Sequence, residues 1–297
     1  MNSQRKHIAV SFCVAYDWEM LRLSIPPIYE RADQICLSID ESRVSWSGNK
    51  FSWDQEGFMK MLAELDPKGK IRLFEANFYV PTLTPMQNEV RQRNEIAKFI
   101  GGDGWHIQLD TDEIFLNFEG FVHYLQSFRS RRKVNIACPW ITAYKQTEDG
   151  FFFVKPSDFS QIEFIQIATL HPDYEYGRRN GNFNVRSPFA LLHLSWARSE
   201  QEIWEKINNW GHKDDIDIQG EFDRWKNLSA DNFHTYRNFH PVVPEAWPAL
   251  GFIAAKDVAH LMALPEGTIR LPLTKRKLRI ENSIWVSRAK KYLRFKR

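Results

Sequence analysis

The sequence predicts a mixed α/β fold in which a mainly parallel central sheet is flanked by helices. Three observations lead to this class. Strand-like and helix-like segments alternate through the first hundred residues, two strand-like runs end at an aspartate, and a hairpin signal follows later in the chain. With 297 residues and 43% hydrophobic content, the chain can bury a large core, and we expect one domain over residues 1–268 followed by a basic tail over 269–297.

The first elements form a β-α-β unit that a further helix and strand extend. We expect, in order, a strand at Ile8–Ala15, a helix at Asp17–Tyr29 disturbed by Pro26-Pro27, a strand from Gln34 ending at Asp40, a helix at Gln55–Leu65 closed by Asp66-Pro67-Lys68-Gly69, and a strand at Lys70–Asn77. Strands joined by helices in this way pair in parallel.

An acidic triplet follows the next strand. Thr84-Pro85 opens a long helix that stops at Gly101-Gly102, and the strand-like run from Trp105 then leads into Asp110-Thr111-Asp112-Glu113. Successive strand residues point to opposite faces, so the two aspartates converge only if the chain turns between them. Carboxylate oxygens suit Mg²⁺ or Mn²⁺, and open α/β sheets bind ligands at the carboxyl ends of their strands. The triplet therefore predicts a metal site that handles a diphosphate. A lone acidic turn also has local uses, but the apolar runs on both sides favour the metal.

The second half of the chain makes the sheet mixed. We expect a helix at Phe118–Phe128, a strand at Val134–Tyr144, a hairpin at Asp149-Gly150 into Phe151–Val154, strands at Ile162–Thr169 and Phe189–Leu194, and a helix from Ser199 to about Trp210. The polar loop Asp173–Arg186, rich in Gly and Arg, is typical of a ligand-binding loop or a lid.

Charge and cysteine content narrow the class of protein. Three cysteines without a CxxC pair favour reduced core residues over a zinc site or a disulfide frame. Mean hydropathy is −0.47, and no stretch approaches the roughly 18 apolar residues of a membrane span. No signal-peptide pattern opens the chain, so we expect a cytoplasmic protein. From Arg270 onward, eleven Lys or Arg face one acid, Glu281. That basic amphipathic tail predicts peripheral contact with an anionic membrane, with a helix docked on the body as the alternative. Nucleic acid is not an expected partner, because the body is acidic.

The order of these motifs resembles the GT-A glycosyltransferases, in particular bacterial relatives of glycosyltransferase family 2. The resemblance rests on the Asp-ended second strand, the helix with Arg91-Gln92-Arg93-Asn94, the run from Trp105 to Glu113, and His193-Leu194-Ser195-Trp196-Ala197-Arg198-Ser199 followed by Lys206 and His212. It implies the GT-A (nucleotide-diphospho-sugar transferase) fold, a nucleoside contact at Asp40, and a divalent cation held by Asp110, Asp112 and His193, with His212 in reserve. The segment Ser38-Ile39-Asp40-Glu41-Ser42 lacks the acidic pair and glycine common in family 2, so the donor nucleotide stays open.

Several further residues are candidates for the site. Arg93 is preferred to Arg91 for holding a phosphate, because only one of two residues at i and i+2 on a helix easily faces a site. Arg178 and Arg179 are candidates to neutralise a leaving diphosphate. Asp173 and Glu175 are candidates for the base that an inverting transferase requires. Each of these has an ordinary alternative as a solvated side chain.

Taken together, the residues and the resemblance imply a metal-dependent glycosyltransferase that moves a sugar from a nucleotide-diphosphate-sugar donor to a saccharide or glycolipid acceptor in surface polysaccharide biosynthesis. Two alternatives stay open. One is a metal-dependent nucleotidyltransferase, which usually carries a Gly-rich basic phosphate loop that residues 8–18 lack. The other is a non-catalytic carbohydrate-binding protein of the same fold. The sequence does not fix the donor, acceptor, linkage, stereochemistry or oligomeric state.

Overall fold

One eleven-stranded sheet runs through the part of the chain that the structure, a computed structural model, describes, namely residues 5–209, 216–265 and 267–286. Its main path has the order β11-β7-β6-β8-β4-β1-β2-β3, and β5, β9 and β10 join beside it. The strands are β1 (His7–Val14), β2 (Gln34–Asp40), β3 (Ile71–Ala76), β4 (Gly104–Asp110), β5 (Glu113–Phe115), β6 (Val134–Gln146), β7 (Phe151–Val154), β8 (Phe164–Thr169), β9 (Phe183–Arg186), β10 (Leu191–His193) and β11 (Leu250–Ile253).

The direction of the strands divides the sheet. The neighbours β3, β2, β1 and β4 are parallel, whereas β8 is antiparallel to β4 and to β6, and β7 and β11 continue the antiparallel half. Within the second half, β10 and β9 run parallel to β6. The predicted class, a mixed α/β fold with a central sheet flanked by helices, is confirmed. Because β1, β2 and β4 point the same way, their carboxyl ends meet at one edge.

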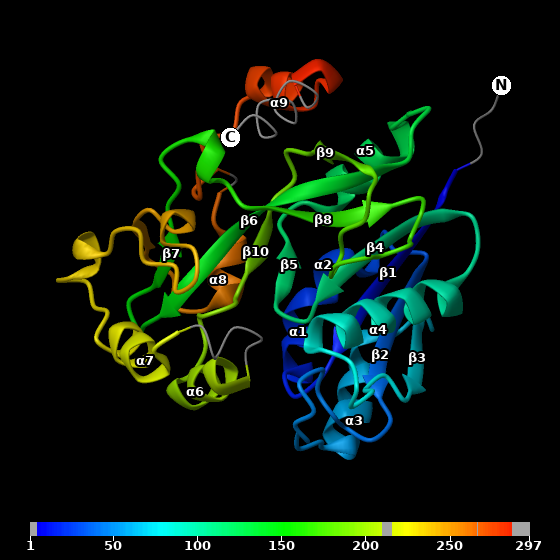
Figure 1. The fold of residues 1–297 in the computed structure, drawn as a ribbon, viewed down its shortest axis with the longest axis horizontal. Coiled ribbons are helices and arrows are strands. Elements are labelled where there is room, and N and C mark those ends of the chain that lie inside the picture. The colour runs from blue at the N-terminus through cyan, green and yellow to red at the C-terminus, as the bar shows by residue number, and fades with distance from the viewer. Residues whose placement is uncertain (1–4, 210–215, 266, 287–297) are drawn as a thin grey trace.

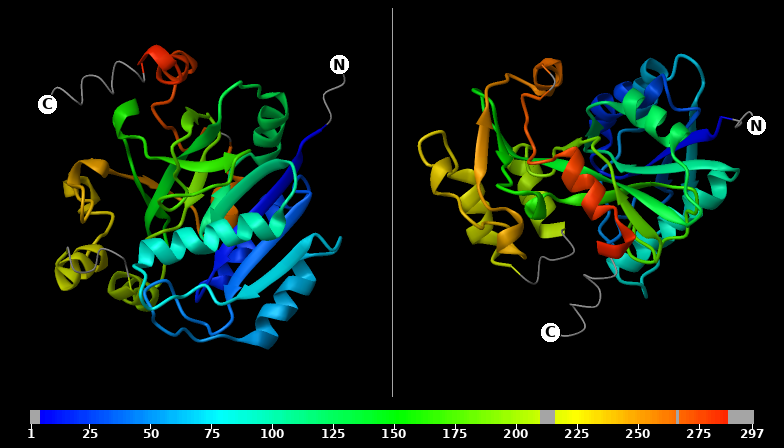
Figure 2. Two further views of the ribbon diagram at one scale, coloured as in Figure 1. Left: turned by 45° about the vertical axis from the view of Figure 1, so that its right-hand side comes forward. Right: turned by 90° about the horizontal axis from the view of Figure 1, so that it is seen from above.

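Helices cover both faces of the parallel half, and further helices pack against the second half of the chain. They are α1 (Leu21–Ser24), α2 (Pro26–Tyr29), α3 (Gln55–Leu65), α4 (Pro85–Ile100), α5 (Phe118–Ser127), α6 (Glu200–Asn209), α7 (Ile218–Lys226), α8 (Val258–Ala263) and α9 (Lys275–Glu281), with short 3-10 helices at Trp18–Met20, Phe159–Gln161, Phe233–Thr235 and Pro244–Ala246. In Figure 1, α4 crosses in front of the parallel strands and α2 lies behind them. The turned views of Figure 2 show α6 and α7 side by side.

The two faces of the parallel strands differ in character because side chains alternate along each strand. One face is apolar and packs against α1, α2, α3 and α5, with Phe12, Leu37 and Ile107 among its buried residues. The alternate residues face α4 and are polar. Gln92 of α4 donates to Ser38 Oγ at 2.8 Å, and Gln108 donates to the carbonyl of Arg93 at 3.1 Å. A polar seam therefore runs under α4 towards the carboxyl ends of the strands.

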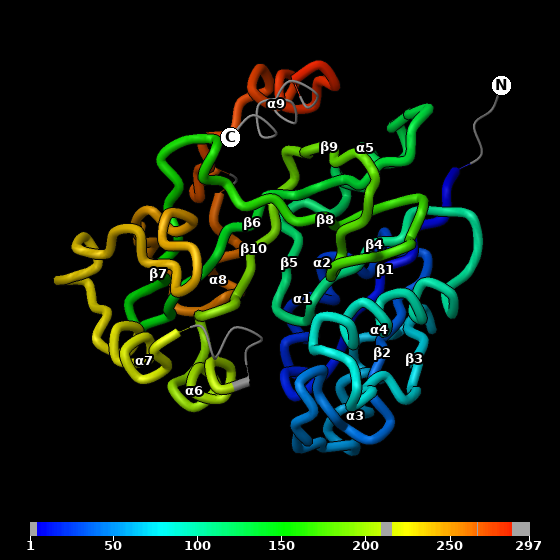
Figure 3. The backbone as a smooth tube through the Cα atoms, in the orientation of Figure 1, coloured from blue at the N-terminus to red at the C-terminus, as the bar shows by residue number. Residues whose placement is uncertain are grey.

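The second half of the chain adds two apolar clusters around the long strand β6. Ile141 and Ala143 pack with residues of β10 and α8 on one face of β6. Tyr144 packs with Trp196, Trp225 and other residues near α6 and α7 in the second cluster. The tube in Figure 3 passes from β6 into β7, and it reaches α6 and α7 after β8, β9 and β10.

Most predicted elements match, and the differences have local reasons. Gln55–Leu65 is a helix with the predicted bounds, and the predicted long helix is α4, capped by Thr84. The predicted helix over Asp17–Tyr29 is divided at Pro26 and Pro27, because proline supplies no N–H to continue the hydrogen bonds. Strands β5 and β9 have only three and four residues and were not predicted. No helix of the described segments is long and apolar enough to cross a membrane.

Part of the predicted basic tail packs on the body. Ile269 and Leu271 lie against the cluster around α8, and Leu278 of α9 is buried with Phe159 and Ile162. Asn282 accepts from the N–H of Arg186 at 2.8 Å and donates to its carbonyl at 2.8 Å. Residues 287–297, which complete the predicted tail, lie outside the described ranges.

We expect Trp105→Ala to lower the free energy of unfolding by about 3–5 kcal/mol, because it empties a fully buried site. The change also removes the indole donor to the carbonyl of Leu125. Urea denaturation measures the difference. Trp285→Ala, at a position 76% exposed, is the matched control and should cost less than about 1 kcal/mol. Equal losses in the two variants would contradict this account of the core.

Candidate active site

A cavity of about 240 Å³ opens at the carboxyl ends of β1, β2 and β4. Aromatic side chains, carboxylates and cations line it together, and they include Tyr16, Asp17, Asp40, Trp46, Phe51, Gln92, Asp110, Asp112, His193, Arg198 and Lys206. Flat aromatic faces suit a nucleobase, and cations beside them suit phosphate oxygens. The cavity lies where an open α/β sheet is expected to hold its ligand.

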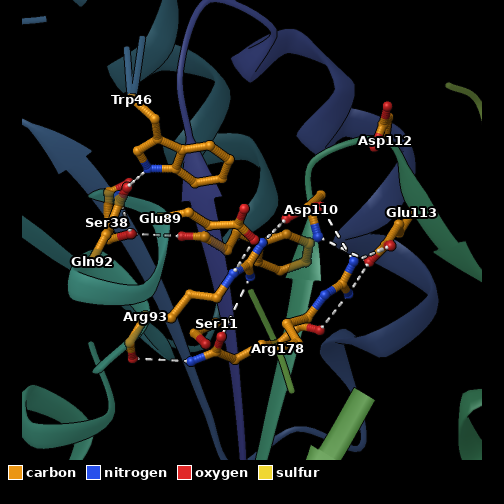
Figure 4. A network of polar contacts seen from close by, with 12 residues as sticks. Ser11, Ser38, Trp46, Glu89, Gln92, Arg93, Asp110, Asp112, Glu113 and Arg178 are labelled. Atoms are coloured by element: carbon orange, nitrogen blue, oxygen red, sulfur yellow. Dashed lines mark hydrogen bonds and ion pairs between the residues drawn. The ribbon is translucent and has the colours of Figure 1, made fainter. Parts of the chain in front are cut away.

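The acidic triplet turns as predicted. Strand β4 ends at Asp110, β5 begins at Glu113, and Thr111 and Asp112 form the turn between them. Asp110 meets two arginines: its Oδ1 accepts from Arg93 Nη2 at 2.8 Å and its Oδ2 from Arg178 Nη2 at 3.2 Å. Burial alone would raise the pKa of Asp110, but these two guanidinium groups hold it below its usual value. Figure 4 shows this network, with Asp112 outside its dashed contacts.

Arg178 also forms a two-point ion pair with Glu113. Its Nη1 donates to Oε2 at 2.7 Å and its Nη2 to Oε1 at 2.6 Å, and both side chains are buried. Burial raises the pKa of Glu113, and Arg178 opposes that shift. Trp140 Nε1 donates to the same carboxylate at 2.9 Å. The loop between β8 and β9, predicted to bind a ligand or act as a lid, is thus fastened to the end of β4 by a buried charge pair.

The neighbouring arginines point elsewhere. Arg179 is exposed, and its guanidinium lies over the ring of Tyr176. On α4, Arg93 is 1% exposed and reaches the acidic strand end, whereas Arg91 donates to the carbonyl of Asn77 and pairs with Glu95. Of these four arginines, Arg93 and Arg178 reach the acidic end of β4, and both donate to Asp110.

Asp112 faces a second group of basic side chains. Arg198 Nη2 donates to its Oδ2 at 2.7 Å, Lys206 Nζ lies 3.7 Å from the same oxygen, and His193 Nε2 lies 3.8 Å from Oδ1. Arg198 also donates to Asp17 at 3.0 Å. Burial favours the neutral acid, but His193, Lys206 and Arg198 hold the pKa of Asp112 well below its usual range. Asp112 is therefore ionised at neutral pH.

His193 is a neutral imidazole at neutral pH. Burial lowers its pKa to about 4, even though Asp112 opposes the shift. Its ring stacks on Trp140 with centroids 4.2 Å apart, and its Nδ1 is buried with no hydrogen-bond partner among the residues described. A neutral imidazole carries the lone pair that a metal requires.

The predicted metal set is only partly brought together. Within the described ranges, no group of three or more His, Cys, Asp or Glu side chains is arranged to hold a metal ion. Both oxygens of Asp110 accept from arginines, whereas Asp112 Oδ1 and His193 Nε2 face each other and line the cavity. Mg²⁺ is often held by one or two carboxylates together with substrate phosphates, and imidazole suits transition metals. Asp112 and His193 fit that kind of site. The reserve ligand, His212, lies outside the described residues.

Asp40 lines the cavity, but its carboxylate is occupied by the backbone. Oδ1 accepts from the N–H groups of Ser42 and Val44, and Oδ2 accepts from those of Phe78 and Tyr79. These four bonds hold the two chain segments that leave β2 and β3. Contact between Asp40 and a nucleoside stays a prediction.

The base candidates from the sequence lie away from the cavity walls. Asp173 and Glu175 are exposed and are not among the lining residues. Between them, Tyr174 is tied to α4, because its N–H donates to Asn94 Oδ1 at 2.9 Å and its carbonyl accepts from Asn94 Nδ2 at 2.9 Å.

The cavity is also lined by residues for which the sequence predicted no role, among them Asp17, Trp46, Arg198 and Lys206. Trp46 stands in a Ser- and Gly-rich loop directly after the Asp-ended strand, and its Nε1 donates to Gln92 at 2.6 Å. A tryptophan in a polar loop at a strand end was the available signal. Arg198 and Lys206 belong to the histidine segment, but their approach to Asp112 depends on the fold.

The sequence matches no family model and no curated protein. Solved structures with similarity include a 4-diphosphocytidyl-2C-methyl-D-erythritol synthase from Anaerococcus prevotii, with 17% identity, 58% of this chain and 68% of that chain covered, and a TM-score of 0.31. HddC from Yersinia pseudotuberculosis complexed with GMP-PN has 10% identity, coverages of 63% and 93%, and a TM-score of 0.32. A mannose-1-phosphate geranyltransferase from Thermus thermophilus has 12% identity, coverages of 75% and 65%, and a TM-score of 0.29. The functional proposal therefore rests on the residues of the site.

We expect Arg178→Ala to cost about 3–5 kcal/mol of unfolding free energy, because it leaves the buried Glu113 carboxylate without its cation. Arg179→Ala, the adjacent exposed arginine, is the matched control and should cost less than about 1 kcal/mol. Chemical denaturation of both variants provides the measurement. If both variants unfolded at the same urea concentration as the unchanged protein, the buried pair would not hold the loop.

Proposed function

We propose that this chain is a metal-dependent glycosyltransferase of GT-A architecture, which transfers a sugar from a nucleotide-diphosphate-sugar donor to a saccharide or glycolipid acceptor. The observation that carries the proposal is the meeting, in one cavity, of aromatic walls, the cations Arg198 and Lys206, and the facing pair Asp112 and His193. The aromatic walls would match the nucleoside of such a donor, and the cations and the facing pair would match its diphosphate. Assembly of a surface polysaccharide is the setting that the resemblance to GT-A enzymes implies.

The nucleoside would lie between the aromatic walls. Tyr16 follows β1, while Trp46 and Phe51 belong to the loop after β2, so the two segments enclose the cavity from neighbouring strand ends. The hydrogen bond from Trp46 to Gln92 fixes the indole against α4. Stacking of this kind holds a base without selecting one, so the donor nucleotide is left open.

The diphosphate would lie beside Arg198 and Lys206. Burial lowers the pKa of Lys206 to about 8, with Arg198 adding to the shift, and the amine is still mostly charged at pH 7. Positive groups that are fixed before the reaction stabilise the charge that develops on a departing nucleoside diphosphate. A bound Mn²⁺ or Mg²⁺, held by Asp112 and His193, would supply further positive charge there. Asp110 would not be a direct ligand, because Arg93 and Arg178 hold both of its oxygens.

Two other classes of protein are separated by the same experiment. A nucleotidyltransferase would release pyrophosphate from a nucleoside triphosphate, and a non-catalytic carbohydrate-binding protein would bind a saccharide without a donor. Donor binding, donor hydrolysis and pyrophosphate release are measured separately, so each class has its own signature.

We expect binding of one member of a UDP-, GDP- and TDP-sugar panel to depend on Mn²⁺, and Asp112→Asn to weaken that binding by about 10–100-fold, the range found when support of a metal site is lost. Titration calorimetry with and without Mn²⁺ measures the effect. Asp103→Asn, at an exposed turn, is the matched control. Equal donor binding with and without metal, and in Asp112→Asn, would contradict the metal-dependent mechanism.

Peripheral contact with an anionic membrane, on its cytoplasmic face, is a second part of the proposal. Leu278 anchors α9 to the body, while Lys275, Arg276 and Arg279 are exposed and Ile280 is 43% exposed. A basic helix with exposed apolar side chains matches the composition of helices that lie on lipid headgroups.

We expect the triple change Lys275→Glu, Arg276→Glu and Arg279→Glu to weaken binding to phosphatidylserine-containing vesicles at least ~10-fold, since each basic residue contributes about 1 kcal/mol at such a surface. Co-sedimentation measures the bound fraction. A control with the same charge change at exposed positions elsewhere, Lys60→Glu, Lys98→Glu and Arg131→Glu, should retain binding. Equal loss in both sets would point to net charge instead of this surface.

A further inference from the structure

A row of polar side chains continues from the cavity across one face of the sheet. In the paired strands, His193 of β10 lies opposite Glu113 of β5 on one side and Thr142 of β6 on the other. On the side of β6 away from β10, the backbone N–H of Trp140 donates to the backbone carbonyl of Glu163 at 2.9 Å. Residues that lie opposite each other in neighbouring strands share a face.

The alternation of β6 shows which face this is. Ile141 and Ala143 point into the apolar cluster around α8, so Trp140 and Thr142 point to the opposite face. His193, which lines the cavity, stacks on Trp140 on that same face. The polar face therefore begins at the candidate donor site and extends over β6 to Glu163.

The hydrogen bonds to the Glu163 carboxylate go to one of its two oxygens, Oε2. Its Oε2 accepts from Trp247 Nε1 at 3.2 Å and lies 3.5 Å from Thr142 Oγ1, which donates to it. In the described segments, no group donates to Oε1, and the side chain is half-buried. Burial raises the pKa of Glu163, while its two hydrogen bonds oppose that shift. The free oxygen sits on a carboxyl whose orientation is fixed.

Four other acids at or beside the cavity pair with cations, and a fifth, Asp40, is held by backbone N–H groups. Asp110 and Glu113 pair with Arg178, and Asp112 and Asp17 pair with Arg198. Within the described ranges, no Lys or Arg pairs with Glu163. A carboxylate paired with arginine is a poor proton acceptor, because the cation lowers the proton affinity of the acid. Glu163 therefore differs from its neighbours in the property that a general base needs.

We propose that the face carrying Thr142 and Glu163 binds the acceptor, and that Glu163 Oε1 is the general base for its hydroxyl. This inference rests on the proposed glycosyltransferase function. Glu163 lies two strand spacings from β10, about 10 Å, with β6 between them. Trp247 and Thr142 position the carboxylate through its other oxygen, Oε2.

The step balances with the groups named. The acceptor hydroxyl gives its proton to Glu163 Oε1 as its oxygen forms a bond to the anomeric carbon of the donor sugar. The bond from that carbon to the diphosphate oxygen breaks, and the nucleoside diphosphate leaves with the electron pair. Attack from the side opposite the leaving group inverts the anomeric centre. The inference therefore also assigns an inverting outcome.

The test uses the full chain with Mn²⁺ and the sugar nucleotide that it binds from the UDP-, GDP- and TDP-sugar panel. Transfer is measured to p-nitrophenyl glycosides, and to water as donor hydrolysis. We expect Glu163→Gln to lower kcat about 10²–10⁴-fold, the usual contribution of a general base, while the donor Kd stays within twofold. Glu163→Asp should recover part of the rate. Glu148→Gln, at an exposed hairpin position, is the matched control and should leave kcat unchanged.

The outcomes distinguish the assignment of Glu163 from the glycosyltransferase proposal on which it rests. A kcat for Glu163→Gln within threefold of the unchanged protein, or a product that retains the donor configuration by NMR, overturns the assignment of Glu163 and leaves the glycosyltransferase proposal standing. Absence of any sugar-nucleotide binding by the unchanged chain overturns both. Circular dichroism of Glu163→Gln checks that the variant is folded, and a folded variant with lost turnover and intact donor binding supports the assignment.

Discussion

The buried contact of Arg178 with Glu113 and Asp110 is the interaction on which the rest of the site depends. It joins a loop that follows β8 to the end of β4, and Arg93 completes the charge balance from α4. Buried ion pairs add little net stability, but losing one partner is costly. The network therefore fixes geometry more than it adds stability. It sets the turn that separates Asp110 from Asp112.

That separation divides the acidic triplet between two tasks. Asp110 is neutralised by arginines and supports the end of the strand, while Asp112 turns towards the cavity and faces His193. The cations Arg198 and Lys206 then lie beside the carboxylate that faces the cavity. The site thus combines fixed positive charge with the metal position proposed at Asp112 and His193, which together would suit a diphosphate.

The polar face of the sheet extends the site beyond the cavity. Strand register places His193 beside Thr142, and a side-chain hydrogen bond joins Thr142 to Glu163. The apolar cluster behind Ile141 and Ala143 keeps β6 in that orientation. A donor site and an acceptor face can then share a rigid support. Rigid positioning of reacting groups is where most of the rate gain in such a transfer would arise.

The sequence by itself determined the class of the fold, the order of its elements and the turn at Asp110 and Asp112, because periodicity and capping are local properties. Helix α3 has the predicted bounds, and Thr84 caps α4 as expected. Only the tertiary structure decided which residues from distant segments contact each other. Arg178 approaches Glu113 across 65 residues of sequence, Arg198 approaches Asp112 across 86, and Glu163 joins Thr142 through strand pairing. Contacts between distant segments depend on packing and register, which no local pattern encodes.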